Sequence, residues 1–264
     1  MTAGSGTDWN PEAYDRFRGL RLRPALDLLA QVPGLPAGEI VDLGCGSGAA
    51  GPALAQRFAG RVLHGLDRSP AMLEQAEQTG AYARLEQGNM DGWQATAPVA
   101  LIFSNAALNW VGDHAGLLPR LAGQLAPGGV LAVQCPRQQQ APSHALLRSL
   151  SAQMFPDRFD WTGWREEVED LSGYDRILTP LGRVSLWETV YAQVLPADPA
   201  AHPVRRFTES TAARRVLDRL DGAEAEAFLA RYDAALEMAY PRRDDGSVLL
   251  PFRRIFFTLT RPEG

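Results

Sequence analysis

Residues 41–48 read Val-Asp-Leu-Gly-Cys-Gly-Ser-Gly, and this stretch is the strongest indication of the fold. Three glycines at alternate positions follow a short, largely apolar segment, Glu39–Leu43, and a segment with helical character, Ala49–Phe58, comes next. Glycine lets the chain turn sharply after a strand and lets the backbone approach a ligand where a Cβ atom would collide. The order strand, glycine loop, helix is typical of a nucleotide-binding α/β sheet.

Strand and helix patterns continue to alternate on the C-terminal side of this loop. Pro70 follows Ser69, which is the arrangement expected where a helix begins with proline in its first turn. We expect strands at Arg61–Leu66, Ala83–Gln87, Val99–Phe103 and Val130–Gln134, and helices at Ser69–Gln78 and His114–Leu125. Strands that are almost wholly apolar and alternate with helices predict a doubly wound parallel sheet covered on both faces.

The pattern changes after Pro136. We expect helices at Pro11–Val32, Ser143–Phe155, Trp164–Ile177 and Ala223–Tyr240, and strands at Val184–Val194 and Phe252–Thr260. The 57 residues between those two strands are too many for a structureless loop, so they predict a helical cap over the edge of the sheet. The expected organisation is a flexible tail (1–8), a nucleotide-binding core (9–138), a helical segment (139–182), two edge strands (183–194 and 252–260) and the cap insertion (195–251).

Composition excludes several classes of function. The chain has 264 residues and a formal net charge of −5, and all 26 of its basic residues are arginines. Without lysine there is no Schiff-base chemistry and no phosphate loop built on lysine, and without a concentrated basic run a nucleic-acid partner is not expected. No segment has the apolar length of a membrane span or the layout of a secretory signal, and the two cysteines, Cys45 and Cys135, are expected to be reduced thiols. We therefore expect a cytoplasmic protein with no membrane partner.

The glycine loop alone leaves two cofactors open. Gly44, Gly46 and Ala49 also satisfy the relaxed dinucleotide fingerprint, and Asp67 at the end of the second strand suits a ribose hydroxyl in either case. Asp42 tips the balance, because a carboxylate just before the first glycine suits a cationic amino-acid group better than a pyrophosphate. Gly88-Asn89-Met90 after the third strand offers an amide and a thioether for an adenine ring.

At these residues the sequence resembles class I S-adenosylmethionine (SAM) methyltransferases, with VDLGCGSG as the first motif and GLDRSPAML, residues 65–73, as the second. Further segments spread from Asp8 to about Thr260 make it similar, more narrowly, to the trans-aconitate 2-methyltransferase family. They are DWNPEAYDRF (8–17), FSNAALNW (103–110), GGVLAVQCP (128–136), AFLARYDAALEMAYP (227–241) and LLPFRRIFF (249–257).

The resemblance implies a fold, a reaction and a set of site residues. The fold would be a seven-stranded mixed, Rossmann-like sheet with a helical cap, and the reaction would form the monomethyl ester of a small polycarboxylate such as trans-aconitate, leaving S-adenosylhomocysteine. The cofactor contacts would come from Asp42, Gly44, Gly46, Gly48, Asp67, Arg68, Met72, Asn89, Met90 and Asn105. The substrate contacts would come from Tyr14, Trp110, Arg214, Tyr240 and Arg254. Asn89 departs from the family, which often has an acidic residue at this position.

The expected chemistry needs no general base, because a carboxylate substrate is already ionised at pH 7. No metal site is expected either. The four histidines are scattered without metal-ligand spacing, and His114 at a helix start is more often a structural residue. Adjacent strand residues face opposite sides, so only one of Arg253 and Arg254 can point into the site. Surface pairing is the alternative role for Arg254 and Arg214, and core packing is the alternative for the aromatic residues.

Several alternative functions stay open from the sequence. They are methylation of another small-molecule or carrier-bound acid, methylation of a phenol with His114 as base, SAM binding without catalysis, and a nicotinamide-dependent dehydrogenase. The sequence leaves the oligomeric state open.

Overall fold

The computed structural model describes residues 18–164 and 166–263 of the chain. Its helices are α2 (Arg18–Ala30), α3 (Gly51–Arg57), α4 (Pro70–Glu77), α5 (His114–Gly123), α6 (Pro142–Met154), α7 (Leu171–Leu178), α8 (Pro203–Glu209), α9 (Arg214–Leu217) and α10 (Gly222–Ala239). Its strands are β1 (Ile40–Leu43), β2 (Leu63–Asp67), β3 (Arg84–Gln87), β4 (Val99–Asn105), β5 (Leu125–Pro136), β6 (Arg183–Leu195) and β7 (Val248–Thr260). Short 3₁₀ turns lie at η1 (Leu108–Trp110) and η2 (Thr179–Leu181).

The strands form one seven-stranded sheet in the order β3-β2-β1-β4-β5-β7-β6. β1 pairs in parallel with β2 and β4, and β4 pairs in parallel with β5. β7 is antiparallel to β5, with Val130 opposite Thr260. The chain therefore reverses its direction of winding between β3 and β4, so the expected doubly wound mixed sheet is confirmed, and ligands bind such sheets at the carboxyl ends of the strands next to this switch point.

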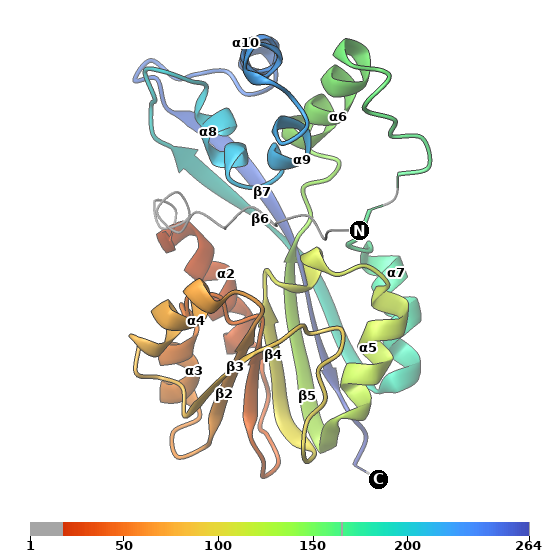
Figure 1. Ribbon diagram of the computed structural model, residues 1–264. Helices are drawn as coiled ribbons and strands as arrows, with labels where there is room; N and C mark the ends of the chain where they lie inside the picture. Colours follow the sequence, from red (N-terminus) through yellow and green to blue (C-terminus); the bar gives the residue numbers. More distant parts are fainter. Residues whose placement is uncertain (1–17, 165, 264) are drawn as a thin grey trace, which may run out of the picture. The chain divides into compact units, whose positions relative to one another are not determined.

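Apolar side chains cover both faces of the sheet. One core cluster joins Leu43, Ile102 and Val133 of the strands to Leu118 of α5 and Tyr174 of α7. A second cluster lies on the opposite face and joins Ile40, Phe103 and Ala132 to Leu28 of α2 and Leu54 of α3. Figure 1 shows the same division, with α2 and α3 on one side of the strands and α5 and α7 on the other. The central strands are buried on both sides, which explains their continuous apolar runs.

The chain divides into two compact units, which are described separately. Within the described residues, the sheet unit comprises 21–138, 166–191 and 252–263. The helical unit comprises 18–20, 139–164 and 192–251, and contains α6, α8, α9 and α10. In the helical unit α10 is fixed to α6 by the Tyr232 hydroxyl, which donates to the Ser143 carbonyl at 2.9 Å, and by the Ser143 N–H, which donates to the Tyr240 hydroxyl at 3.2 Å.

Three expected elements differ in the structure, and one of them is the last strand, β7, which begins at Val248 instead of Phe252. The helix expected at Trp164–Ile177 is α7 alone, because the Asp170 side chain accepts a hydrogen bond from the Gly173 N–H at 2.7 Å and caps the helix there. The apolar residue that extended the helical spacing upstream, Val168, is fully buried outside any helix. The helix expected to reach Leu125 ends at Gly123, and β5 begins at Leu125, ahead of Pro127 rather than after it.

Within the described ranges, no helix is long and apolar enough to cross a membrane.

Candidate functional site

The glycine turn after β1 is held against the end of β2. The Gly44 and Cys45 N–H groups both donate to the Leu66 carbonyl, at 2.8 and 3.0 Å. Gly44 has φ of +80°, and a Cβ atom there would collide with the Cβ of Ala107. Gly46 has φ of +54°, but a Cβ atom there would meet nothing within 4 Å. Protein atoms thus fill the space beside Gly44, whereas the space beside Gly46 is open.

Asp67 joins this turn to the start of α4. Its carboxylate accepts from the Gly46 N–H at 2.8 Å and from the Ser69 N–H at 2.9 Å. Ser69 caps α4, as expected from the Ser-Pro pair, with its hydroxyl accepting from the Met72 N–H at 3.4 Å. A carboxylate can accept about four hydrogen bonds, so Asp67 has capacity for ligand hydroxyl groups as well.

Asp42 is buried in β1 and its carboxylate accepts a hydrogen bond from the Tyr82 hydroxyl at 2.7 Å. Burial raises the pKa of Asp42 to about 7, the Tyr82 hydrogen bond opposes that rise, and the nearby charge of Asp67 adds to it. The Tyr82 ring fits here because Gly65, opposite Asp42 in β2, has no side chain; a Cβ atom there would lie 2.8 Å from the ring.

Polar side chains from four neighbouring strands share one face of the sheet. We call Asp42, Asn105, Gln134 and Arg254 the polar row. Each is two residues from a member of the α2-side core, which contains Ile40, Phe103, Ala132 and Phe256, and side chains two apart on a strand point to the same face. The strand register agrees, because Asp42 lies opposite Phe103 and Asn105 lies opposite Gln134. The row runs from carboxylate in β1 to guanidinium in β7.

Arg254 is the basic end of the polar row. It is 3% exposed, its Nη1 donates to the Gln134 Oε1 at 3.0 Å, and its Cζ lies 4.7 Å from the centre of the Phe252 ring. Arg253, its neighbour, is exposed. Of the two neighbouring arginines, Arg254 is thus the buried one, and the prediction that it points into the substrate site stays a prediction.

Asn105 lies between the two ends of the row, at the end of β4. Its Oδ1 is buried and accepts no hydrogen bond within the described chain. A buried acceptor without a donor costs free energy unless a ligand satisfies it. This oxygen is therefore suited to a ligand that carries N–H donors.

The remaining cofactor candidates lie around the same turn. The Met90 methyl group is 3.0 Å from the position of a Cβ on Gly44, and the Met90 carbonyl accepts from Arg120 Nη2 at 2.8 Å. Asn89 and Arg68 are exposed, and Met72 is buried in α4. A Cβ atom on Gly48 would lie within 3.0 Å of atoms of Ala76 and Tyr82, so the absence of a side chain there lets the turn pack against α4.

The substrate candidates belong to different units of the chain. Trp110 ends η1 in the sheet unit and is 44% exposed. Arg214 and Tyr240 belong to the helical unit: the Arg214 Nε lies 3.2 Å from Asp218, whereas Tyr240 is buried at the end of α10 with its hydroxyl bonded to Ser143. Tyr14 lies outside the described residues.

His114 has structural contacts on both ring nitrogens. Nδ1 lies 2.8 Å from the Tyr174 hydroxyl and Nε2 lies 2.9 Å from the Leu108 carbonyl, and the ring is buried. These contacts fix the start of α5 against α7 and η1, which favours the structural interpretation of this residue. Across the described part of the chain, no group of three or more His, Cys, Asp or Glu residues is placed to hold a metal ion.

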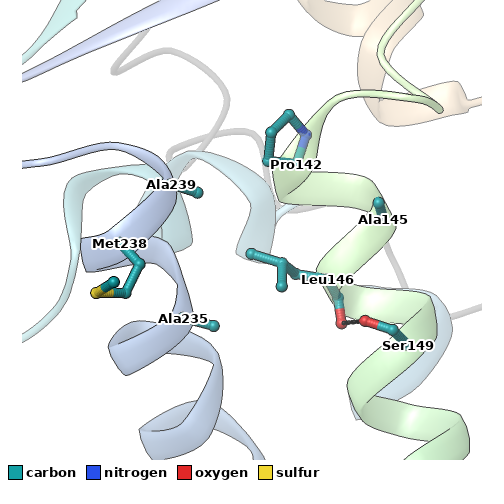
Figure 2. Close-up of a pocket in the computed structure, with 7 residues that line it drawn as sticks. All are labelled: Pro142, Ala145, Leu146, Ser149, Ala235, Met238 and Ala239. Atoms are coloured by element: carbon teal, nitrogen blue, oxygen red, sulfur yellow. Dashed lines mark hydrogen bonds between the residues drawn. The ribbon is translucent and has the colours of Figure 1, made fainter.

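A separate shallow hollow lies in the helical unit between α6 and α10 (Figure 2). It is lined by Pro142, Ala145, Leu146, Ser149, Ala235, Met238 and Ala239. Its lining has no charged group, and the Ser149 hydroxyl already donates to the Leu146 carbonyl at 3.3 Å. A polycarboxylate would find no cation there.

Sequence reasoning missed two residues that contact the predicted site. Tyr82 lies 40 positions from its partner Asp42, and only the fold shows their contact. Gln134 carried a visible signal, because it is the one polar residue in the apolar run Val130–Cys135.

Comparison with known proteins agrees with the fold. Residues 40–129 match the family model described as "Methyltransferase domain". Among solved structures, the YcgJ protein of Bacillus subtilis has a TM-score of 0.54 at 15% identity, covering 95% of this chain and 100% of that one. Phosphoethanolamine N-methyltransferase 2 of Haemonchus contortus, solved with SAM, has a TM-score of 0.53 at 16% identity, covering 91% of this chain and 52% of that one. At such identities these two likenesses concern the fold alone.

Similarity to curated sequences is closer and extends over nearly the whole chain. A trans-aconitate 2-methyltransferase of Methylobacterium nodulans is 42% identical over 96% of this chain and 98% of its own length. The enzyme of that name from Paracidovorax citrulli is 38% identical over the same shares, and the one from Escherichia coli is 37% identical over 97% of this chain and 100% of its own. The chain belongs to the trans-aconitate 2-methyltransferase family.

Proposed function

We propose that this protein transfers the methyl group of SAM to a carboxylate of trans-aconitate and forms the monomethyl ester. Family membership supports the reaction and the substrate. The observation that carries the proposal is the polar row, which has carboxylate at its β1 end and guanidinium at its β7 end on one face of the sheet. A cationic methyl donor suits the first end and an anionic substrate suits the second.

The residues around the glycine turn fit SAM. The space beside Gly46 is open where a Cβ atom would otherwise point, and the Asn105 Oδ1 is a buried acceptor without a donor. We infer that Asp67 holds the ribose hydroxyls and that Asp42 and Asn105 face the ammonium group of the methionine part. Met90 and Asn89 would frame the adenine, with Gly44, Gly48, Met72 and Arg68 shaping the pocket around them.

The substrate would be held by its charge. Arg254 is a buried guanidinium, and a guanidinium matches a carboxylate in two-point geometry. Trp110 would supply an apolar wall, and Tyr14, Arg214 and Tyr240 stay candidates for the remaining carboxylates.

Methyl transfer to a carboxylate requires alignment of the two reactants but no proton transfer to the protein. SAM supplies a methyl group on a sulfonium, and its carbon–sulfur bond breaks, leaving the electron pair on sulfur, as a carboxylate oxygen of the substrate forms the new carbon–oxygen bond. The substrate acid has a reference pKa near 4, so no protein group needs to remove a proton. Holding the carboxylate in line with the methyl group is the contribution left to the protein, and such alignment is worth roughly 7 to 11 kcal/mol.

A cytoplasmic location belongs to the same proposal. Cys45 and Cys135 are both free and buried, and burial raises the pKa of each thiol, so both stay protonated. Unpaired cysteines are usual in a reducing compartment.

The test is turnover. The protein is incubated with SAM and trans-aconitate, and the product is analysed by mass spectrometry for one added methyl group and for S-adenosylhomocysteine. Turnover of another acid in a panel, with none of trans-aconitate, would replace the substrate and keep the reaction class. Binding of S-adenosylhomocysteine with no methyl consumption across the panel would mean that the protein only binds the cofactor.

A further inference from the structure

Gln134 is a primary amide buried inside a hydrophobic strand. Its neighbours in β5 from Val130 to Cys135 are all apolar, and its side chain is 0% exposed. Burying an amide without hydrogen bonds costs on the order of a few kcal/mol. An apolar residue would fit this strand without that cost, so the amide calls for a functional explanation.

Only half of the amide has a partner. The Gln134 Oε1 accepts from Arg254 Nη1 at 3.0 Å, whereas the Gln134 Nε2 is buried with no hydrogen-bond acceptor within the described chain. The arginine fixes this orientation, because exchanging the oxygen and nitrogen of the amide would set two N–H donors against each other. The NH₂ group must therefore point away from the guanidinium bond, as an unused donor.

The position of this donor is informative. Gln134 lies opposite Asn105 in the β4–β5 register, and its side chain is on the same face as Asn105 and Arg254. An acceptor without a donor in β4, the Asn105 Oδ1, thus neighbours a donor without an acceptor in β5. The first suits the ammonium of the cofactor. The second suits an anion on the side of Arg254.

We propose that Gln134 is a substrate-binding residue whose Nε2 donates to the same carboxylate that Arg254 holds. The two side chains form one clamp, because the Oε1 bond orients the guanidinium while the NH₂ group adds a neutral donor beside it. A guanidinium has five N–H donors, and the bond to Gln134 uses one of them. This inference rests on the proposed function, since it names the partner of the carboxylate at that same site.

Two substitutions separate the roles of the amide. Gln134→Met keeps the length of the side chain and removes both polar groups, so the KM for trans-aconitate should rise about tenfold or more, as expected for loss of a hydrogen bond to a charged group. Gln134→Glu keeps the acceptor for Arg254 but places a negative charge beside the substrate, so its KM should rise further than that of the Met variant. The dissociation constant of S-adenosylhomocysteine, measured by calorimetry, should stay within about threefold in both.

Gln124→Met is the matched control. Gln124 is also a partly buried glutamine with hydrogen bonds to neighbouring backbone, but it lies in the turn between α5 and β5, where its Nε2 donates to the Trp93 carbonyl at 3.3 Å. Its loss should lower thermal stability without changing the KM for trans-aconitate. A second readout is direct: in the wild-type protein saturated with S-adenosylhomocysteine, trans-aconitate should shift the side-chain NH₂ resonances of Gln134 in a ¹⁵N spectrum.

The outcomes distinguish the two proposals. A wild-type protein without turnover and without S-adenosylhomocysteine binding overturns the proposed function itself. A wild-type protein that forms the ester, with unchanged KM in a folded Gln134→Met variant or unmoved Gln134 resonances, overturns the role of Gln134 alone.

Discussion

At the scale of single residues, the proposed contact between Asp42 and the SAM ammonium predicts that cofactor binding depends on pH. Its pKa is raised to about 7 in the folded protein, whereas its ordinary value is 3.8, so the free protein holds a proton there between those values. As pH rises, Asp42 loses its proton in the unfolded chain before it does in the folded protein. The Asp42 carboxyl therefore lowers the free energy of unfolding of the free protein as pH rises from about 4 through 7. A cationic ligand needs the ionised form, so SAM affinity should rise about fivefold from pH 6 to pH 7.

Calorimetry in buffers of different ionisation enthalpy checks this expectation, because SAM binding near pH 7 should release a proton. Asp42→Asn should bind SAM more weakly and without the pH dependence. Tyr82→Phe removes the hydrogen bond that opposes the raised pKa, so the midpoint of the pH profile should move upward. A wild-type affinity that is flat between pH 6 and 7 would contradict the assignment of Asp42 to the cofactor ammonium.

Arg254 and Asp67 should separate substrate binding from cofactor binding. Arg254→Ala removes the basic end of the polar row, so the KM for trans-aconitate should rise by about two orders of magnitude while the KM for SAM changes little. Asp67→Ala leaves Arg254 in place and removes the carboxylate that accepts from Gly46 and Ser69, so SAM should be the ligand affected. Steady-state kinetics with each substrate varied in turn gives both constants. Equal losses for both substrates in Arg254→Ala would place this arginine in a general structural role.

At the scale of elements, the glycine turn between β1 and α3 has a structural side and a ligand side. Gly44→Ala forces a Cβ atom into Ala107 at a positive φ, so it should lower the free energy of unfolding by about 1 to 3 kcal/mol or more. Gly46→Ala also has a positive φ, but its Cβ enters open space, so its cost should be about 1 kcal/mol. That open space is where we place SAM. Gly46→Ala should therefore weaken S-adenosylhomocysteine binding strongly while costing little stability, as calorimetry and urea unfolding would measure. If Gly46→Ala instead cost more stability than Gly44→Ala and left binding unchanged, the placement of SAM beside Gly46 would be wrong.

The elements also show where sequence patterns are reliable. Ser69 followed by Pro70 predicted the cap of α4, because both signals act within one turn of helix. The pattern failed between Trp164 and Asp170, where Val168 is fully buried without being helical. The spacing of apolar residues indicates which residues are buried, but a buried residue need not be helical. Here the Asp170 side chain accepts a hydrogen bond from the Gly173 N–H, so the helix begins only after Asp170.

At the scale of the whole molecule, the sheet order explains which site residues were predictable. Glycines 44, 46 and 48 follow β1 and Asp67 is the last residue of β2, all within the motifs, so their positions in a doubly wound sheet could be inferred from local spacing. Gln134 and Tyr82 contact candidate site residues only through pairings across long stretches of chain, Gln134 with Arg254 120 positions away and Tyr82 with Asp42 40 positions away. Such contacts depend on register, which a single sequence does not fix.

The division into two units predicts how ligand binding spreads through the molecule. The cofactor residues we propose all belong to the sheet unit, so S-adenosylhomocysteine at 100 times its dissociation constant should stabilise that unit by about 2.7 kcal/mol and slow exchange of its most protected amides about 100-fold. Amides of α6 and α10 should change little.

Asp221→Ala should affect the helical unit instead. It removes the capping box of α10, in which Asp221 accepts from the Glu224 N–H at 2.9 Å, so it should speed amide exchange in α6 and α10 about fivefold. Hydrogen exchange followed by mass spectrometry reads both units in one experiment. Uniform slowing of both units by S-adenosylhomocysteine, together with uniform acceleration by Asp221→Ala, would show instead that the two units open as one cooperative structure, because the strands β6 and β7 run through both.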